Sequence, residues 1–391
     1  MLIPVVEITK RPDDRPEGAY HPVHDQNLLM DKVARWGRLG DVLIMDRDAE
    51  DGHGDNEDLI RRLVKLAPCR VQGGIASEDQ ANSWVRAGIH RLVLDADSTP
   101  DLLARLPRRH LLARLTYPDT TEGDGIGHRT RALVEAIQVL APQVSGFVCV
   151  TAGSLDAINE SMARQLSRAT PQPITLAVNK ASVADLVRFD RLGFDVACPV
   201  HNIAPAATPE DVLLATVDFS AGPLATIVSD QYGQVLMLAR SSRETLVRTF
   251  ASGRCVFSDN DQTDHVLVRL RMNCRRDALW FTVTPHGRSC RRNTHSCFGD
   301  GAPEFGLARL FDVIRDRREH PLPGSYTSFL FEKDDRLPRK LNEEIYELLT
   351  APTHENLVWE SADVLYFYLA FLAQKGVSLD EVVTELRGRE Q

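Results

Sequence analysis

Eight short apolar runs, separated by segments long enough to form a helix, fill the first half of the chain. The runs cover residues 2–8, 41–48, 69–75, 90–97, 111–117, 146–153, 174–180 and 194–200. Segments between them, such as 56–66 and 78–88, carry apolar residues at helical spacing. Eight alternations of strand and helix are typical of a parallel barrel. We therefore expect an α/β domain of the (β/α)8-barrel type over residues 1–208.

The pattern changes twice after the expected barrel. Residues 201–211 are rich in proline and alanine and break the alternation, which predicts a boundary. Residues 209–301 should form a small α+β domain, because one clear helix at 242–253 lies among β-rich segments at 225–230, 234–240, 254–259, 265–272 and 278–284. A Gly/Pro-rich linker at 299–306 follows, and residues 302–391 have helical periodicity. We expect an all-α helix bundle there.

Composition limits the partners of this chain. The formal net charge of −9 argues against non-specific nucleic-acid binding. No run approaches the roughly 20 apolar residues of a membrane span, and the first residues lack a secretory signal. We expect a cytoplasmic protein whose phosphorylated substrate would need magnesium or local basic residues.

Five carboxylates lie on two of the expected helices: Glu343, Glu344 and Glu347 within residues 339–350, and Glu360 and Asp363 within residues 356–376. Spacings of three and four place acids on one face of each helix, and neighbouring helices build magnesium sites in this way. A solvated acidic face is the commoner reading of any single glutamate. Against it, the second helix is so apolar that it should be buried nearly all round, where unpaired carboxylates are costly.

A hydroxyl-rich loop at 324–331 precedes these helices. Ser325, Tyr326 and Thr327 offer hydroxyl groups there, and basic residues that follow, Lys340 among them, are candidate phosphate partners. Together the loop, the E-E-x-x-E helix and the E-x-x-D helix resemble phosphoribosyl-ATP pyrophosphohydrolases of histidine biosynthesis. The resemblance implies hydrolysis of phosphoribosyl-ATP to phosphoribosyl-AMP and pyrophosphate. It implies that Glu344, Glu347, Glu360 and Asp363 hold magnesium, and that these acids with Glu343 are catalytic.

Seven cysteines give an odd count, which favours reduced thiols. Cys69, Cys149 and Cys198 lie in apolar runs and should be buried. Three others, Cys274, Cys290 and Cys297, could hold zinc or could be buried or partner-paired thiols.

The segment 229–259 and these three cysteines resemble phosphoribosyl-AMP cyclohydrolase, whose zinc ligands come from both subunits of a dimer. The resemblance implies zinc at Cys274, Cys290 and Cys297 and a homodimer. That family places magnesium-binding aspartates around its first zinc cysteine. Here Asn273, Arg275 and Arg276 stand beside Cys274, and an arginine repels a divalent cation. We therefore expect ring opening to be impaired or lost.

The first domain resembles the barrel isomerase of the same pathway, but Glu7 stands where that family has a catalytic aspartate. We expect a degenerate barrel serving as scaffold or dimerisation surface. The domain order resembles the front part of the fungal-type multifunctional histidine-biosynthesis protein. Two alternatives stay open: a paralogue that acts on a related nucleotide in specialised metabolism, and a catalytically silent assembly partner.

Overall fold

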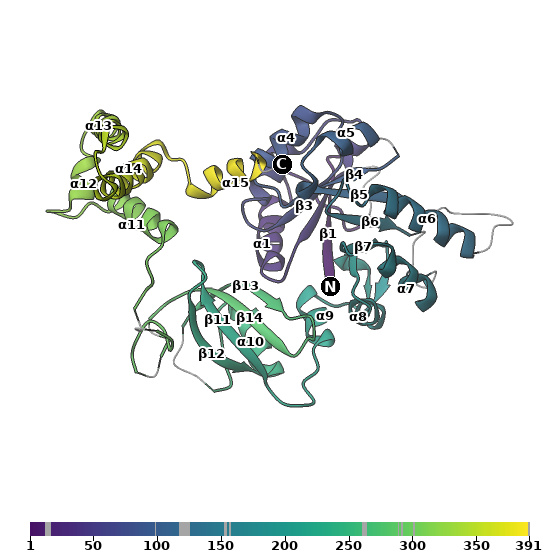
Figure 1. Cartoon of the computed structure of the whole chain (residues 1–391). Helices are drawn as coiled ribbons and strands as arrows, with labels where there is room; N and C mark the ends of the chain where they lie inside the picture. The colour runs from purple at the N-terminus through teal and green to yellow at the C-terminus, as the bar shows by residue number, and fades with distance from the viewer. Residues whose placement is uncertain are drawn as a thin grey trace. The chain divides into compact units, whose positions relative to one another are not determined.

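The computed structural model describes residues 1–11, 17–97, 99–116, 126–151, 155, 158–259, 264–287, 289–290, 292–299 and 302–389. The chain divides into two compact units, Met1–Gly301 and Ala302–Gln391. The first unit contains a closed barrel and a separate four-stranded sheet, and the second is helical (Figure 1). Each unit is described by itself.

The first half of the chain is a closed barrel of eight parallel strands in sequence order. Its strands are β1 (Leu2–Ile8), β2 (Val42–Asp46), β3 (Cys69–Gln72), β4 (Arg91–Asp95), β5 (Leu111–Thr116), β6 (Gly146–Val150), β7 (Ile174–Ala177) and β9 (Asp195–Pro199). Each of the eight apolar runs contains one strand, so the barrel prediction is confirmed. Alternate residues such as Ile3 and Val5 fill the interior, while Val6 and Ile8 pack under the surrounding helices.

Helices follow the barrel strands and bury apolar faces against them. They are α1 (Gln26–Gly37), α2 (Arg47–Glu50), α3 (Glu57–Leu63), α4 (Glu78–Arg86), α5 (Pro100–Arg105), α6 (Ile126–Leu140), α7 (Glu160–Ala169), α8 (Val183–Arg191) and α9 (Pro209–Thr216). Side chains of Ser77, Asn159, Ser182 and Thr208 cap the helices that follow them. A short parallel pair, β8 (Ala181–Ser182) and β10 (Ile203–Ala204), was not expected from the sequence.

The second part of this unit is a four-stranded sheet with the order β12-β11-β14-β13. Its elements are β11 (Leu224–Asp230), β12 (Val235–Ser241), α10 (Arg243–Ser252), β13 (Val266–Met272) and β14 (Ala278–Thr284). The expectation of a strand-like segment at 254–259 is wrong, since only Arg254 makes an isolated bridge. Cys255 and Phe257 are apolar because they pack into the core from a loop.

The two faces and one edge of this sheet have different surroundings. One face packs on α10 through residues such as Val228 and Leu246. The other face exposes Ile227, Leu238 and Trp280, which the strand register places side by side. At the β13 edge, the backbone N–H of Leu270 donates to the carbonyl of Arg38 in the barrel, at 2.7 Å. The barrel therefore contacts that edge at Leu270, while residues 253–255 bond to the start of β13.

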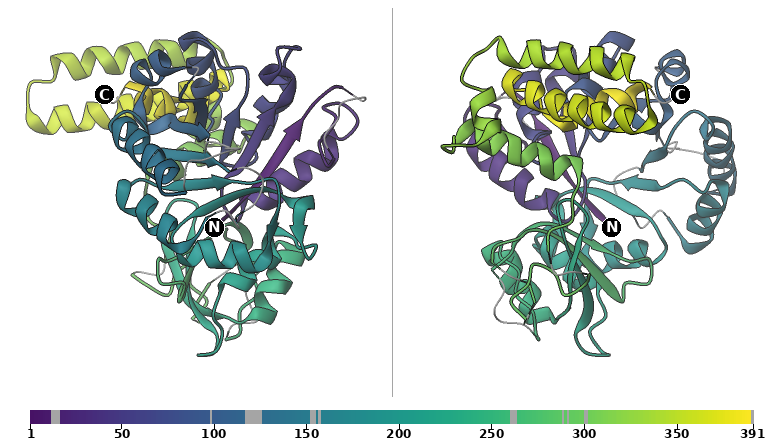
Figure 2. Two further views of the ribbon diagram at one scale, coloured as in Figure 1. Left: turned by 90° about the vertical axis from the view of Figure 1, so that its right-hand side faces the viewer. Right: turned by 60° about the vertical axis from the view of Figure 1, so that its left-hand side comes forward.

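The C-terminal unit is helical, as the sequence predicted. It contains α11 (Leu307–Glu319), α12 (Tyr326–Leu330), α13 (Arg336–Thr350), α14 (His354–Lys375) and α15 (Leu379–Arg389). Figure 2 shows α13 and α14 side by side, and α14 also packs on α11. Buried side chains of α11 and α13 meet the second half of α14 in one core. Among the residues described, no helix is both long enough and apolar enough to cross a membrane.

The first half of α14 is exposed in this single chain. Val358 is 57% exposed and Trp359 is 70% exposed, and Tyr346 and Leu349 of α13 are exposed as well. The expectation that α14 is buried nearly all round is therefore wrong here. The reason is that burial begins at Phe367, where α14 enters the core shared with α11 and α13.

Candidate functional site

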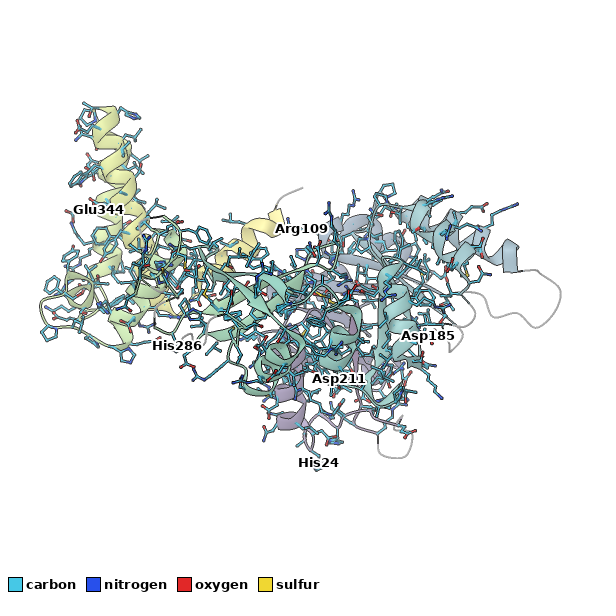
Figure 3. All side chains as sticks on the ribbon, turned by 90° about the horizontal axis from the view of Figure 1, so that it is seen from below. His24, Arg109, Asp185, Asp211, His286 and Glu344 are labelled. Carbon is cyan, nitrogen blue, oxygen red and sulfur yellow. The ribbon has the colours of Figure 1, made fainter. Side chains whose placement is uncertain are left out.

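Three carboxylates from α13 and α14 converge in the C-terminal unit. One oxygen from each of Glu344, Glu360 and Asp363 lies within 4.8 Å of the others. Glu344, labelled in Figure 3, is only 5% exposed, while the other two are half-buried. The i, i+3 spacing of Glu360 and Asp363 directs both toward α13 because α14 packs along it. This arrangement can bind a hard cation through oxygen ligands.

Glu347 lies beside this group, close enough for its side chain to act on Glu360. Burial raises the pKa of Glu360, and the negative charges of Glu347, Glu344 and Asp363 raise it further. Four acids thus repel one another in one place. A divalent cation fits this donor set, because it would neutralise the repulsion and use carboxylate oxygens that magnesium prefers.

Lys340 holds two of the acids on α13. Its Nζ lies 3.0 Å from Oε1 of Glu343 and 3.1 Å from Oε1 of Glu344, and these contacts, led by that of Glu343, raise the pKa of Lys340. The side chain of Glu343 is 53% exposed, and it is not among the three converging acids. The structure therefore places Lys340 against the acid cluster and Glu343 at its solvent side.

The hydroxyl-rich loop is attached to α14 next to the acids. Ser325 caps α12 by accepting from the N–H of Ser328, and the Thr327 hydroxyl lies 2.8 Å from that of Tyr366. Tyr366 follows Asp363 by three residues and so lies one turn further along the same face.

The ring of Phe367 connects the loop to Lys340. Tyr326 packs edge-on against Phe367 with ring centroids 6.4 Å apart, and the Lys340 ammonium lies 5.7 Å from the Phe367 centroid. A hollow of about 920 Å³ opens beside the loop, with Ser325 and Tyr326 among its lining residues. Tyr366 and Phe367 were not predicted from the sequence, although their place one turn beyond Asp363 is a signal for them.

The three predicted zinc cysteines lie in two places within one chain. Cys290 and Cys297 follow β14 and are in hydrogen-bonding contact with each other. A hydrogen bond with Thr294 lowers the pKa of Cys290, whereas burial raises that of Cys297. Cys274 is exposed in the turn between β13 and β14, at the opposite end of this hairpin. A single chain therefore brings two of the three thiols together. Cys69, Cys149 and Cys198 are buried, as expected.

The residues around Cys274 make structural contacts instead of forming an acidic site. The side-chain oxygen of Asn273 accepts from the backbone N–H groups of Asp277 and Ala278, both at 3.1 Å. Arg276 adopts a positive φ of 61° and forms an ion pair with Asp190 of α8 in the barrel. These contacts fix the turn against the barrel.

Glu7, near the end of β1, also has an ion-pair partner within the chain. Its carboxylate pairs with Arg47, and Arg47 is 3.0 Å from Glu50. The carboxylate of Glu7 is thus held by an internal ion pair.

Comparison with known proteins identifies the domain that carries these carboxylates. Residues 307–390 match the family model described as phosphoribosyl-ATP pyrophosphohydrolase. This range contains α13 and α14 with their carboxylates, and the match indicates a diphosphatase.

Several histidine-biosynthesis proteins are similar to longer parts of the chain. The "Histidine biosynthesis bifunctional protein HisIE" of Pyrococcus furiosus is 34% identical over 196 residues, which cover 44% of this chain and 92% of that protein. The "Histidine biosynthesis bifunctional protein his7" of Schizosaccharomyces pombe is 30% identical over 204 residues, 47% of this chain and 48% of that protein. The "Histidine biosynthesis trifunctional protein" of Neurospora crassa is 31% identical over 175 residues, 42% of this chain and 20% of that protein.

The shared region is longer than the whole C-terminal unit, since 44% of the chain exceeds residues 302–391. The similarity therefore extends into the first unit. The chain belongs to the HisIE family of bifunctional histidine-biosynthesis proteins, and its residues 307–390 form a phosphoribosyl-ATP pyrophosphohydrolase domain.

Proposed function

We propose that the C-terminal unit hydrolyses phosphoribosyl-ATP to phosphoribosyl-AMP and pyrophosphate as a step of histidine biosynthesis. The observation that carries this proposal is the convergence of Glu344, Glu360 and Asp363 within 4.8 Å on two packed helices. Triphosphate hydrolysis needs a cation held by a few carboxylates, with coordination positions left for phosphate oxygens and water. The matched family model supports the same substrate.

In this proposal Glu344, Glu347, Glu360 and Asp363 would hold magnesium, which when bound would neutralise charge on the triphosphate. The same acids, with Glu343 at the solvent side, would orient the attacking water. Lys340 would bind a phosphate oxygen by giving up its exposed partner Glu343, which can turn into solvent.

The loop would bind the substrate beside these acids. Ser325, Tyr326 and Thr327 lie at or next to the hollow, and Phe367 connects Tyr326 to Lys340. Hydroxyl donors at the loop suit phosphate or ribose oxygens, and the Tyr326 ring offers a surface for a base.

The test is to incubate purified protein with phosphoribosyl-ATP and magnesium and to follow pyrophosphate release and ring opening in one sample. We expect pyrophosphate in the wild type and its loss in Glu344→Ala and Asp363→Ala. Unchanged turnover in both variants would refute the site. Neither product in the wild type would favour another nucleotide substrate or a silent assembly partner.

We further propose that the protein is a homodimer, with the exposed apolar face of α13 and α14 covered by a second copy. Exposed apolar patches of this kind mark association sites. The patch comprises Ile345, Tyr346, Leu349, Leu357, Val358 and Trp359. It lies on the two helices that carry the acids, so association would also exclude water beside the site. The exposed sheet face of Ile227, Leu238 and Trp280 is a second such surface.

Zinc is proposed at Cys274, Cys290 and Cys297. Cys290 and Cys297 already contact each other, and a second copy would supply Cys274, because the same chain's Cys274 lies at the far end of the hairpin. Thiolates are suitable zinc ligands, and zinc when bound would activate a water. We infer that ring opening is nevertheless impaired or lost. Arg275 and Arg276 stand in the turn where the related cyclohydrolases carry acids, and Arg276 is held there by Asp190 of α8.

A further inference from the structure

A basic cavity lies inside the first unit, where the barrel meets the middle sheet. It has a volume of about 260 Å³. Its barrel side is formed at the N-terminal ends of β2, β3 and β9 by Asp41, Arg70 and Asp195. Its sheet side is formed by Arg269 and Arg271 of β13 and by Arg276 of the following turn. We refer to it as the junction cavity.

Three aspartates near this cavity already have partners. The Arg70 guanidinium lies 2.8 Å from Asp41 and 3.3 Å from Asp195, and its third bond goes to the Thr175 hydroxyl at 2.7 Å. His90 also contacts Asp41, and Arg276 forms its ion pair with Asp190. These contacts neutralise the acids and occupy each of the three guanidinium nitrogens of Arg70.

Neither Arg269 nor Arg271 forms an ion pair with a carboxylate in the described part of the chain, although the charge of Asp41 acts on Arg269. The Nε–H group of Arg269 is buried and donates to no hydrogen-bond acceptor there. Arg271 lies over the Trp280 ring, 5.2 Å from its centroid, with no carboxylate paired to it. Burial and the nearby charge of Arg271 lower the pKa of Arg269, yet an arginine stays protonated near neutral pH.

We propose that the junction cavity binds the phosphate group of a small phosphorylated metabolite through Arg269 and Arg271. Two neighbouring guanidinium groups offer several N–H donors in the planar geometry that suits phosphate oxygens. The ligand would satisfy the buried Nε of Arg269 and relieve the repulsion between the two arginines. The volume admits a phosphate group with a few further atoms, and a whole nucleoside triphosphate would not fit.

This site is distinct from the usual ligand site of a barrel. Barrel enzymes place their ligands at the C-terminal ends of the strands. The junction cavity lies at the N-terminal ends, and half of the charged side chains that line it come from β13 and the turn that follows. A ligand there would bridge the barrel and β13, so its binding would stabilise their contact.

The test is isothermal titration calorimetry of the full chain with inorganic phosphate and, separately, with ribose 5-phosphate. EDTA is included so that the acids of the C-terminal unit hold no cation. We expect Arg269→Gln to weaken binding at least about tenfold, because a hydrogen bond to a charged group is lost. Arg271→Gln should weaken binding as well. Because Arg271 is exposed, this variant keeps the proposal testable even if Arg269→Gln fails to fold.

Two controls separate this site from others. Arg248→Gln removes an exposed arginine of α10, and Glu344→Gln alters the proposed magnesium site; neither should change phosphate binding. Binding of both ligands identifies the phosphate group alone as sufficient, and binding of ribose 5-phosphate only identifies an ester; both support the proposal. No binding of either ligand at millimolar concentration, or equal binding by the wild type and both arginine variants, would overturn it.

Discussion

Replacing Glu344 by glutamine should weaken magnesium binding by the C-terminal unit. Glutamine keeps the volume of this side chain, which is 5% exposed, but removes one of three converging charges. Loss of a supporting partner of a metal ligand already costs about 10–100-fold in affinity, so we expect loss of a ligand to cost about 100-fold. The neighbouring acids remain, so the site keeps weak binding.

The affinity loss converts into a stability difference. At a magnesium concentration of about 100 Kd, the wild type should gain about 2.7 kcal/mol, and the variant about 0.4 kcal/mol. For a domain of this size the difference of about 2.3 kcal/mol corresponds to roughly 9–18 °C in Tm. The assay is thermal unfolding with EDTA and with magnesium, together with pyrophosphate release.

Glu355→Gln is the matched control, because Glu355 is exposed in the first turn of α14 and lies outside the acid cluster. It should respond to magnesium like the wild type. If Glu344→Gln shows the full magnesium-dependent rise in Tm, Glu344 is not a ligand and the reasoning from its convergence with Glu360 and Asp363 fails.

Other predictions follow from the site and the exposed surfaces. The raised pKa of Glu360 gives stability that is present below its unfolded pKa and is lost as pH rises through its folded pKa. The metal-free protein should therefore lose less stability above about pH 4.3 in Glu360→Gln than in the wild type, as measured by urea unfolding in EDTA. Phe367→Ala should lower the free energy of unfolding of the C-terminal unit by about 3–5 kcal/mol in denaturant titrations, since Phe367 is 4% exposed in its core. Trp359→Glu should shift the protein toward monomer in light scattering; an unchanged mass would count against the proposed interface. Cys297→Ser should reduce bound zinc in elemental analysis, and full retention would contradict the proposed ligand.

The barrel and the acid cluster were predictable because each depends on local periodicity. Continuous apolar runs such as those of β2 and β6 are buried on both faces, and such runs can be recognised in the sequence without knowing which elements pack on them. Glu360 and Asp363 share a face by helical geometry alone. The strand predicted at 254–259 is wrong because Cys255 and Phe257 are buried from a loop, and an apolar sequence indicates burial but not backbone pairing.

Features that depend on tertiary contacts could not be read from the sequence. The first half of α14 resembles a core helix in sequence although its apolar side chains are exposed in this chain, because composition alone does not tell which apolar residues the chain itself covers. Arg269 and Arg70 are far apart in the sequence, and only the docking of β13 on the barrel brings both to one cavity.

The backbone hydrogen bond between Leu270 and Arg38 suggests a structural use for the barrel, in which Glu7 is held in an internal ion pair. A bare border strand displays unpaired amides and carbonyls that recruit strands from other molecules and lead to aggregation. By docking on β13, the barrel shields that border of the middle sheet. Solubility of the middle sheet then depends on the barrel whatever else the barrel does, so deletion of the barrel should yield an insoluble remainder.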